Sequence, residues 1–175
     1  MTRLFIVISL IIFIVQVHSQ VVTDTGYIVK IGDKSPDIFL QLTSGETIQL
    51  SKQKGKVVVL QFTASWCSVC RKEMPHLEKE VWLPNKDKNF ILIGVDYDEP
   101  LEKVVAFKKQ MKITYPMALD PGAEIFARFA HKRSGVTRNV VIDQKGKIVF
   151  LTRLFDKKEF KAMKSVIQDL LKNNP

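Results

Sequence analysis

The chain has 175 residues, with 27 lysine and arginine residues against 18 aspartate and glutamate residues, a formal net charge of +9. Because 46% of the residues are hydrophobic and 26% are charged, the composition excludes a disordered chain and suits one globular domain with a substantial core. The sequence contains no repeat with a period of about 20 to 50 residues, so we do not expect a solenoid fold. No basic-aromatic motif accompanies the charge, so nucleic acid is not an expected partner.

The first segment has the layout of a secretory signal peptide. Arg3 precedes an apolar run over 4–15, and small residues at the −3 and −1 positions mark a cleavage site after Ser19. We therefore expect residues 1–19 to be removed and residues 20–175 to form one domain in the periplasm or another extracytoplasmic compartment. The run is shorter than the roughly 20 apolar residues of a membrane-spanning helix, so a retained N-terminal membrane anchor is the alternative.

The mature chain begins with strand-like patterns. Apolar residues alternate over 38–42 and 48–50 around a turn, which predicts two short strands. The continuous apolar run over 57–62 is typical of a strand buried on both faces. Helical spacing follows over 71–82, where Pro75 is expected to kink or loosen the helix.

The later part of the chain alternates between strand-like and helical patterns. Its predicted elements are a strand at 90–97, a helix at 98–111, a short strand or turn at 115–120, a short helix at 123–130, a hairpin at 139–151 and a helix at 156–172. Asp98 is expected to cap the helix that it begins. This order predicts an α/β fold in which helices flank a central mixed sheet, with an N-terminal β extension.

Both cysteines, Cys67 and Cys70, lie in the stretch TASWCSVC directly after the first buried strand. Two intervening residues close too short a loop to stabilise the fold, and two cysteines are too few for a zinc site, so no metal or other cofactor is expected. A Cys-x-x-Cys pair beside a βαβ pattern is typical of a thioredoxin-like redox centre. At the helix start, Cys67 should have a lowered pKa and act as the nucleophile, while Cys70 resolves the mixed disulfide.

Residues 32–78 resemble the opening of the TlpA/ResA-like thiol-disulfide oxidoreductases of the thioredoxin superfamily. The resemblance rests on the lead-in GDKSPD, the strand GKVVV, the centre WCSVC and the helix RKEMP, and the later stretch GVTRNVVIDQKGKIV is similar to that family's hairpin. It implies a thioredoxin-like fold and an exported enzyme with a redox-active disulfide. Its implied partners are disulfide-containing exported proteins and a membrane or extracytoplasmic electron donor, and we expect a monomer.

The same resemblance assigns roles to three further residues. It makes Trp66 an aromatic side chain at the edge of the site that contacts substrate. Glu73 matches an acidic residue that assists proton transfer, with an exposed helix glutamate as the equal alternative. Gln61 stands where thioredoxin has a buried aspartate, which leaves Glu73 as the nearest candidate proton carrier.

The sequence departs from the family pattern at Thr137, which stands where the family has a substrate-facing cis-proline. Thr137 is expected to contact substrate. A cis bond before a non-proline residue costs about 2.5–4 kcal/mol, so we expect the bond from Val136 to be trans. Arg138 is expected to be an exposed loop residue, or alternatively to hold a thiolate.

Two other functions compete with disulfide exchange. A peroxiredoxin-like peroxidase would have a threonine three residues before its reactive cysteine, where this chain has Ala64. A thioredoxin-like binding module would not need both cysteines. The sequence therefore favours a protein-disulfide reductase or exchange enzyme and leaves the direction of electron flow open.

Overall fold

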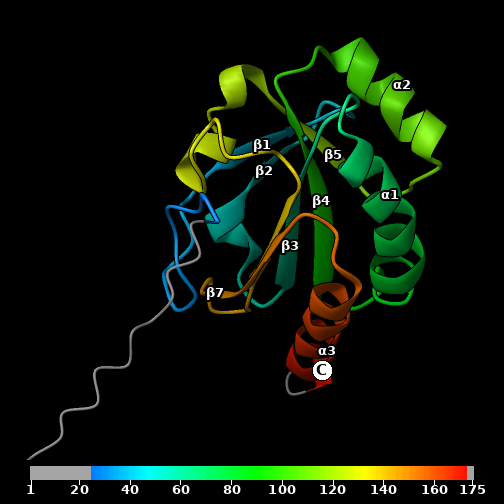
Figure 1. The fold of residues 1–175 in the computed structure, drawn as a ribbon. Coiled ribbons are helices and arrows are strands. Elements are labelled where there is room, and N and C mark those ends of the chain that lie inside the picture. The colour runs from blue at the N-terminus through cyan, green and yellow to red at the C-terminus, as the bar shows by residue number, and fades with distance from the viewer. Residues whose placement is uncertain (1–24, 173–175) are drawn as a thin grey trace, which may run out of the picture.

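The computed structural model describes residues 25–172 (Figure 1). The predicted signal peptide at 1–19 and its cleavage site lie outside the described residues. In the part of the chain that the structure describes, no helix is both long enough and apolar enough to cross a membrane.

The centre of the molecule is a mixed sheet of seven strands in the order β2-β1-β5-β4-β3-β6-β7. The strands are β1 Phe39–Leu42, β2 Thr47–Gln49, β3 Val57–Thr63, β4 Phe90–Tyr97, β5 Met117–Asp120, β6 Arg138–Ile142 and β7 Ile148–Arg153. β4 runs parallel to both β3 and β5, and the other neighbours are antiparallel. The β1–β2 hairpin is the N-terminal extension, and it lengthens the sheet beyond β5.

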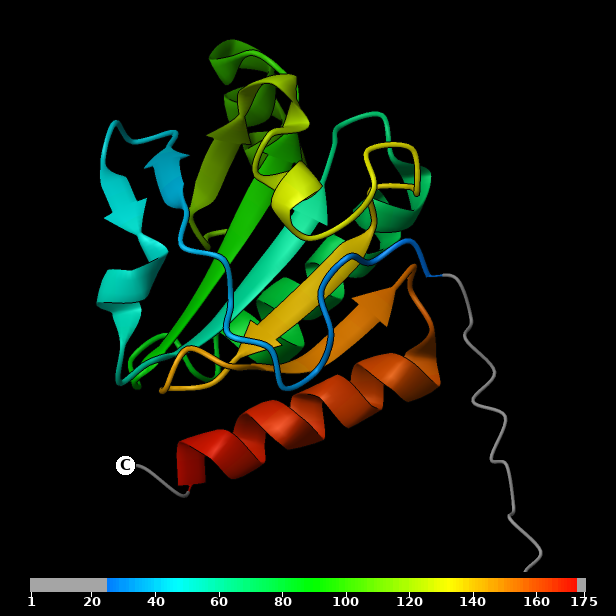
Figure 2. The ribbon, with the colours of Figure 1, turned by 90° about the vertical axis from the view of Figure 1, so that its left-hand side faces the viewer.

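The three long helices lie on one face of the sheet (Figures 1 and 2). They are α1 Ser68–Leu77, α2 Leu101–Met111 and α3 Lys157–Lys172, and α1 continues into η2 Glu78–Trp82. The opposite face is covered by the N-terminal segment and by short 3-10 turns, η1 Leu50–Gln53, η3 Pro121–Ala123 and η4 Phe126–Arg128. The structure confirms the predicted mixed sheet flanked by helices, although its long helices do not divide between the two faces.

Strand β3 explains how the sheet separates two apolar layers. All seven of its residues are buried, and successive side chains point to opposite faces. Val57 and Val59 pack beneath the long helices, whereas Leu60 and Phe62 pack against the 3-10 turns. Burying each such side chain contributes about 1.5–3 kcal/mol, so β3 is firmly fixed where it leads into the cysteines.

Two local predictions are wrong, and a third is confirmed in one of its two forms. Pro75 is followed by a loosened helix, which widens into a π-helical turn in which the Leu83 N–H donates to the Glu78 carbonyl, 3.0 Å away. Asp98 does not cap α2, because its carboxylate instead accepts the N–H of Gly122 at 2.7 Å. The short helix expected at 123–130 is replaced by 3-10 turns.

Candidate active site

Cys67 and Cys70 form a disulfide where β3 ends and α1 begins. Cys67 is the N-cap residue of α1, as the sequence predicts, and its sulfur accepts the N–H of Cys70 at 3.2 Å. Cys67 is 8% exposed and Cys70 is fully buried. The helix N-terminus favours negative charge on the sulfur of Cys67, and Cys67 is also the more accessible of the two.

The hydroxyl of Thr137 lies against both sulfurs of the disulfide. Its oxygen is 3.1 Å from the Cys67 sulfur and 3.2 Å from the Cys70 sulfur, although Thr137 is about 70 residues away in the sequence. No cis peptide bond occurs in the described residues, so the bond from Val136 to Thr137 is trans, as expected. The backbone carbonyl of Thr137 accepts the N–H of Leu154 at 3.0 Å.

Glu73 is buried beneath the pair, with 1% exposure, so the alternative of an exposed helix glutamate is wrong. One carboxylate oxygen accepts the Asn139 amide N–H at 2.7 Å, and the other accepts the Gln61 amide at 3.3 Å. The Tyr115 hydroxyl donates to the remaining oxygen of Gln61 at 2.7 Å. Burial raises the pKa of Glu73 from 4.5 to about 7, while the hydrogen bonds from Asn139 and Gln61 oppose the rise.

Sequence reasoning missed Asn139 and Tyr115 as parts of this network. A signal for Asn139 was available, because it is a polar residue at the start of the otherwise apolar run NVVI. Tyr115 gave no such signal, because a tyrosine beside a predicted strand is most often a packing residue. The structure therefore adds two neutral donors to this network: Asn139 donates directly to Glu73, and Tyr115 donates to Gln61, which in turn donates to Glu73.

Arg138 is fully buried, so the expectation of an exposed loop arginine is wrong. Its guanidinium donates to the carbonyls of Ser134 and Gly135, at 2.8 and 3.1 Å. It also stacks over the ring of Tyr27, 4.5 Å from the centroid. These contacts fix the loop that leads to Thr137.

A second buried acid, Asp96, lies at the carboxyl end of β4, the strand beside β3. No donor reaches either oxygen of its carboxylate, and burial together with the neighbouring charge of Glu99 raises its pKa to about 8. Glu99 itself accepts the N–H and the hydroxyl of Ser65 at 2.6 and 2.7 Å and pairs with Lys103 at 2.5 Å. Protonated Asp96 can donate to Glu99, so the two carboxyls share one charge next to the turn that carries the cysteines.

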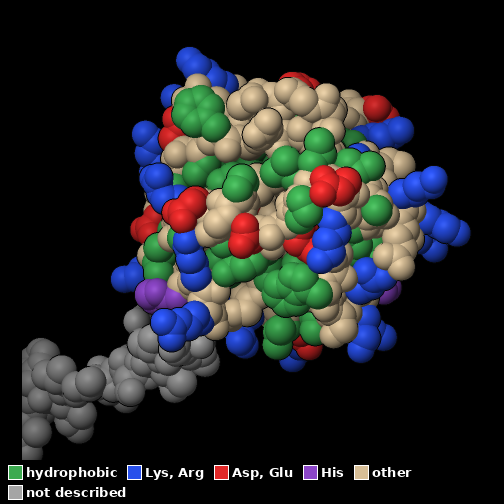
Figure 3. Space-filling model, turned by 90° about the horizontal axis from the view of Figure 1, so that it is seen from above, with side chains coloured by type: hydrophobic (Ala, Val, Ile, Leu, Met, Phe, Trp, Pro, Cys, Tyr) green, Lys and Arg blue, Asp and Glu red, His purple; other side chains and the backbone are tan. Residues whose placement is uncertain are grey.

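The end of the molecule where α1 begins carries many exposed apolar side chains. Figure 3 looks down on the end of the molecule where α1 begins in Figure 1, and apolar side chains gather across that face, with charged groups between and around them. Trp66, beside Cys67, is 62% exposed and makes an edge contact with Tyr97 at 6.4 Å between centroids. The exposed indole of Trp66 is therefore the large apolar group next to Cys67 in the chain.

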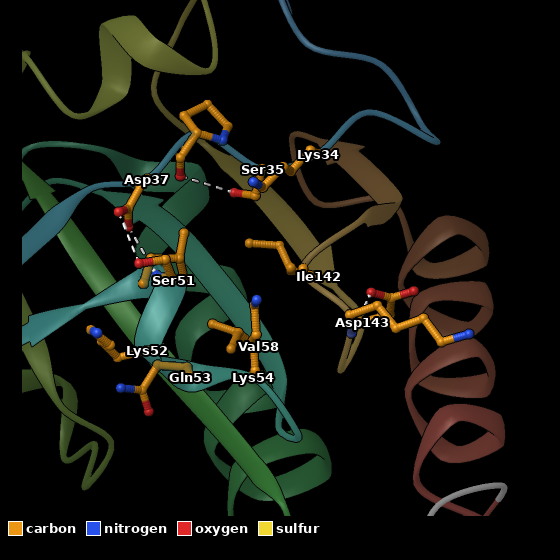
Figure 4. Close-up of a pocket in the computed structure, with 14 residues that line it drawn as sticks. Lys34, Ser35, Asp37, Ser51, Lys52, Gln53, Lys54, Val58, Ile142 and Asp143 are labelled. Carbon is orange, nitrogen blue, oxygen red and sulfur yellow. Dashed lines mark hydrogen bonds between the residues drawn. The ribbon is translucent and has the colours of Figure 1, made fainter.

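A cavity of about 480 Å³ lies at the other end of the sheet (Figure 4). It is lined by Val58 near the start of β3, by Ile142 at the end of β6 and by several lysines. In Figure 4 the carboxylate of Asp37 points to Ser51, whose N–H and hydroxyl it accepts at 2.9 and 2.8 Å. Cys67 follows the opposite end of β3, so this cavity is separate from the disulfide.

Known proteins resemble this chain in sequence and in fold. The family model described as Redoxin matches residues 30–170. Over 120 residues the chain is 33% identical to thiol-disulfide oxidoreductase ResA of Bacillus cereus, covering 69% of this chain and 68% of that protein. Over 132 residues it is 35% identical to ResA of Bacillus thuringiensis, covering 71% and 73%.

Two solved structures extend this comparison to three dimensions. A candidate protein disulfide isomerase from Bacteroides thetaiotaomicron is 57% identical, with a TM-score of 0.82 over 84% of this chain and 93% of that chain. A candidate thiol:disulfide interchange protein DsbE from Chlorobium tepidum is 27% identical, with a TM-score of 0.70 over 82% and 99%.

Proposed function

The chain belongs to the Redoxin family and is a TlpA/ResA-like thiol-disulfide oxidoreductase with a thioredoxin-like fold, and from that premise we propose that it reduces or exchanges disulfides of other extracytoplasmic proteins. The observation that carries the proposal is the Cys67–Cys70 disulfide at the start of α1, in which Cys67 keeps 8% exposure and Cys70 is fully buried. Its substrates are disulfide-containing exported proteins, and an extracytoplasmic or membrane donor returns its electrons.

In the reduced protein, Cys67 is the nucleophile. Its thiolate is stabilised by the N-terminus of α1 and by the Cys70 N–H. It attacks one sulfur of the substrate disulfide, forms a mixed disulfide and expels the other substrate sulfur as a thiolate, which takes a proton. Cys70 then loses its proton and attacks the Cys67 sulfur, which releases the second substrate thiol and restores the observed disulfide.

Glu73 is the proposed proton-transfer group of the site. It is buried three residues after Cys70 in the same helix, so both side chains lie on the same side of α1. A pKa of about 7 allows its carboxyl to take up and release protons near neutral pH. Gln61 and Asn139 hold the carboxyl in place in either state.

Substrate docks at the exposed Trp66, on the apolar face, and at the loop that carries Thr137. Residues 1–19 are removed as a signal peptide, and residues 20–175 function as a monomeric domain in the periplasm or an equivalent compartment. N-terminal mass analysis of the protein recovered from its native host tests this placement. Recovery of intact Met1 in a membrane fraction would instead support the retained N-terminal membrane anchor.

The central test is reduction of insulin disulfides by dithiothreitol with and without catalytic amounts of the protein. Acceleration by wild type and none by Cys67→Ser is the expected result. A reduction potential near −270 mV would indicate a reductant and one near −120 mV an oxidant. Consumption of hydrogen peroxide without disulfide exchange would instead favour the peroxidase alternative.

A further inference from the structure

The position of the Thr137 hydroxyl suggests more than a contact with substrate. It lies 3.1 Å from the Cys67 sulfur and 3.2 Å from the Cys70 sulfur, and its residue is only 3% exposed. A proline at this position would present no hydroxyl to either sulfur. Thr137 therefore places a hydroxyl beside the disulfide at the position where the related family has a proline.

A hydroxyl can accept one proton while it donates another, because it carries one O–H and two lone pairs. In the reduced protein, the Cys70 thiol can donate to the Thr137 oxygen while the Thr137 O–H donates to the Cys67 thiolate. Hydrogen bonds to an ionised group are about twice as strong as neutral ones. In the reduced protein, the Thr137 hydroxyl thus connects the Cys70 thiol, which must later lose its proton, with the negatively charged sulfur of Cys67.

The hydroxyl is held in this position by its neighbours. The Thr137 carbonyl accepts the N–H of Leu154, and the preceding loop is fixed by the guanidinium of Arg138. Threonine has restricted side-chain rotation because it is branched at Cβ. Because the Thr137 hydroxyl is already held in place, it reorganises little when charge moves between the sulfurs.

We propose that the Thr137 hydroxyl relays a proton during the resolving step, an inference that rests on the proposed disulfide exchange. Cys70 forms a bond to the Cys67 sulfur, and the bond between Cys67 and the substrate sulfur breaks. The proton of Cys70 passes to the Thr137 oxygen as the Thr137 hydroxyl proton passes to the departing substrate thiolate. Cys67 and Cys70 end as a disulfide, the substrate ends as a neutral thiol, and Thr137 is unchanged.

Other ionisable groups lie on the elements that pack around the pair. Glu73 lies below it in α1, with hydrogen bonds to Gln61 and Asn139. Glu99 accepts the N–H of Ser65, Asp96 neighbours Glu99, and Arg138 follows Thr137 in β6. Glu73 remains the group that takes up and releases protons near neutral pH, whereas the Thr137 hydroxyl touches both sulfurs, transfers the proton within the resolving step and so qualifies as a catalytic residue.

The test compares wild type with Thr137→Val, which keeps the shape and removes the hydroxyl, and with Thr137→Ser, which restores it. Reduced protein reacts with glutathione disulfide or with an aromatic disulfide, and the release of the second thiol is timed in a stopped-flow instrument. Glutathione is the more basic leaving group and its departure is assisted more by a proton, whereas the aromatic thiol departs readily as a stable thiolate. We expect Thr137→Val to slow release of glutathione about tenfold or more and release of the aromatic thiolate much less, with Thr137→Ser close to wild type.

Equal slowing for both leaving groups, or none for either, would overturn the relay and leave Thr137 as a packing residue. If wild type itself exchanges with neither disulfide, the proposed function fails instead, so the two failures are distinguishable. Thr137→Ala serves if the valine variant does not fold, and circular dichroism of every variant checks the fold.

Discussion

The carboxylate of Glu73 in α1 accepts a hydrogen bond from the side-chain amide of Asn139 in β6, 2.7 Å away and 66 residues apart in the sequence. This contact places an acid inside the protein directly beneath a redox pair. A buried carboxyl with neutral partners holds its proton to a higher pH than an exposed one. The chemistry of the site and the pH dependence of stability are therefore linked through one residue.

Glu73→Gln should flatten the dependence of stability on pH. Below pH 4.5 the carboxyl is protonated in both states; between pH 4.5 and about 7 the unfolded chain releases the proton and the folded protein keeps it. Wild-type stability should thus fall as pH rises through this window, by on the order of 3 kcal/mol. Urea unfolding at intervals between pH 4 and 9 measures the slope, which should be shallower in the glutamine variant, while the share that comes from Asp96 remains.

Glu46→Gln is the matched control, because Glu46 is exposed and lies in the turn between β1 and β2. Its slope should follow wild type. The variant at position 73 should also lose the component of the activity profile that titrates near pH 7. An unchanged stability slope and an unchanged activity profile would argue against a titrating Glu73.

Cys70→Ser should accumulate mixed disulfides with exported proteins, because attack by Cys67 survives and resolution does not. Cys67→Ser should accumulate none, since it lacks the more exposed of the two cysteines, the one at the helix start. Non-reducing gels of cells that express each variant, followed by mass spectrometry, make the comparison. Equal trapping by both variants would show that the roles of nucleophile and resolving thiol are not divided in this way.

Asp96→Asn should stabilise the protein at alkaline pH. The folded state holds the proton of Asp96 until about pH 8, whereas the unfolded chain releases it near 3.8, so stability is lost as pH rises between these values. An amide cannot ionise and avoids this loss. Melting temperatures at pH 5 and pH 9 should show a gain for the variant at pH 9 that exceeds any gain at pH 5.

Asp87→Asn provides the same chemical change at an exposed position and should show no such difference between the two pH values. If Asp96→Asn and Asp87→Asn respond alike, then Asp96 is ionised in the folded protein throughout this range.

Tyr115→Phe should destabilise the fold by about 1–2 kcal/mol, because it leaves the buried oxygen of Gln61 without its donor. Urea unfolding at pH 6 measures the loss. Tyr97→Phe is the matched control: its hydroxyl donates to the Lys132 carbonyl in an exposed contact at 3.0 Å, and its removal should have a much smaller effect. Comparable losses in both variants would mean that Gln61 finds another partner.

The sequence by itself determined the parts of this protein that depend on nearby residues. The apolar runs at 57–62 and 90–97 predicted two buried strands, and the structure has β3 at Val57–Thr63 and β4 at Phe90–Tyr97. The spacing of Cys67 and Cys70 behind β3 indicated the redox pair at a helix start, because strand periodicity and helix capping are set by short stretches of chain.

Only the tertiary structure decided what surrounds that pair. Whether Glu73 faced solvent or the core depended on Asn139, which reaches it from a strand 66 residues away. The contact of Thr137 with both sulfurs required β6 to pair antiparallel with β3, and the burial of Arg138 required Tyr27 to pack from the N-terminal segment. Local patterns place side chains along a helix or strand, but burial, and with it the pKa of an acid, is set by groups that only the folded chain brings together.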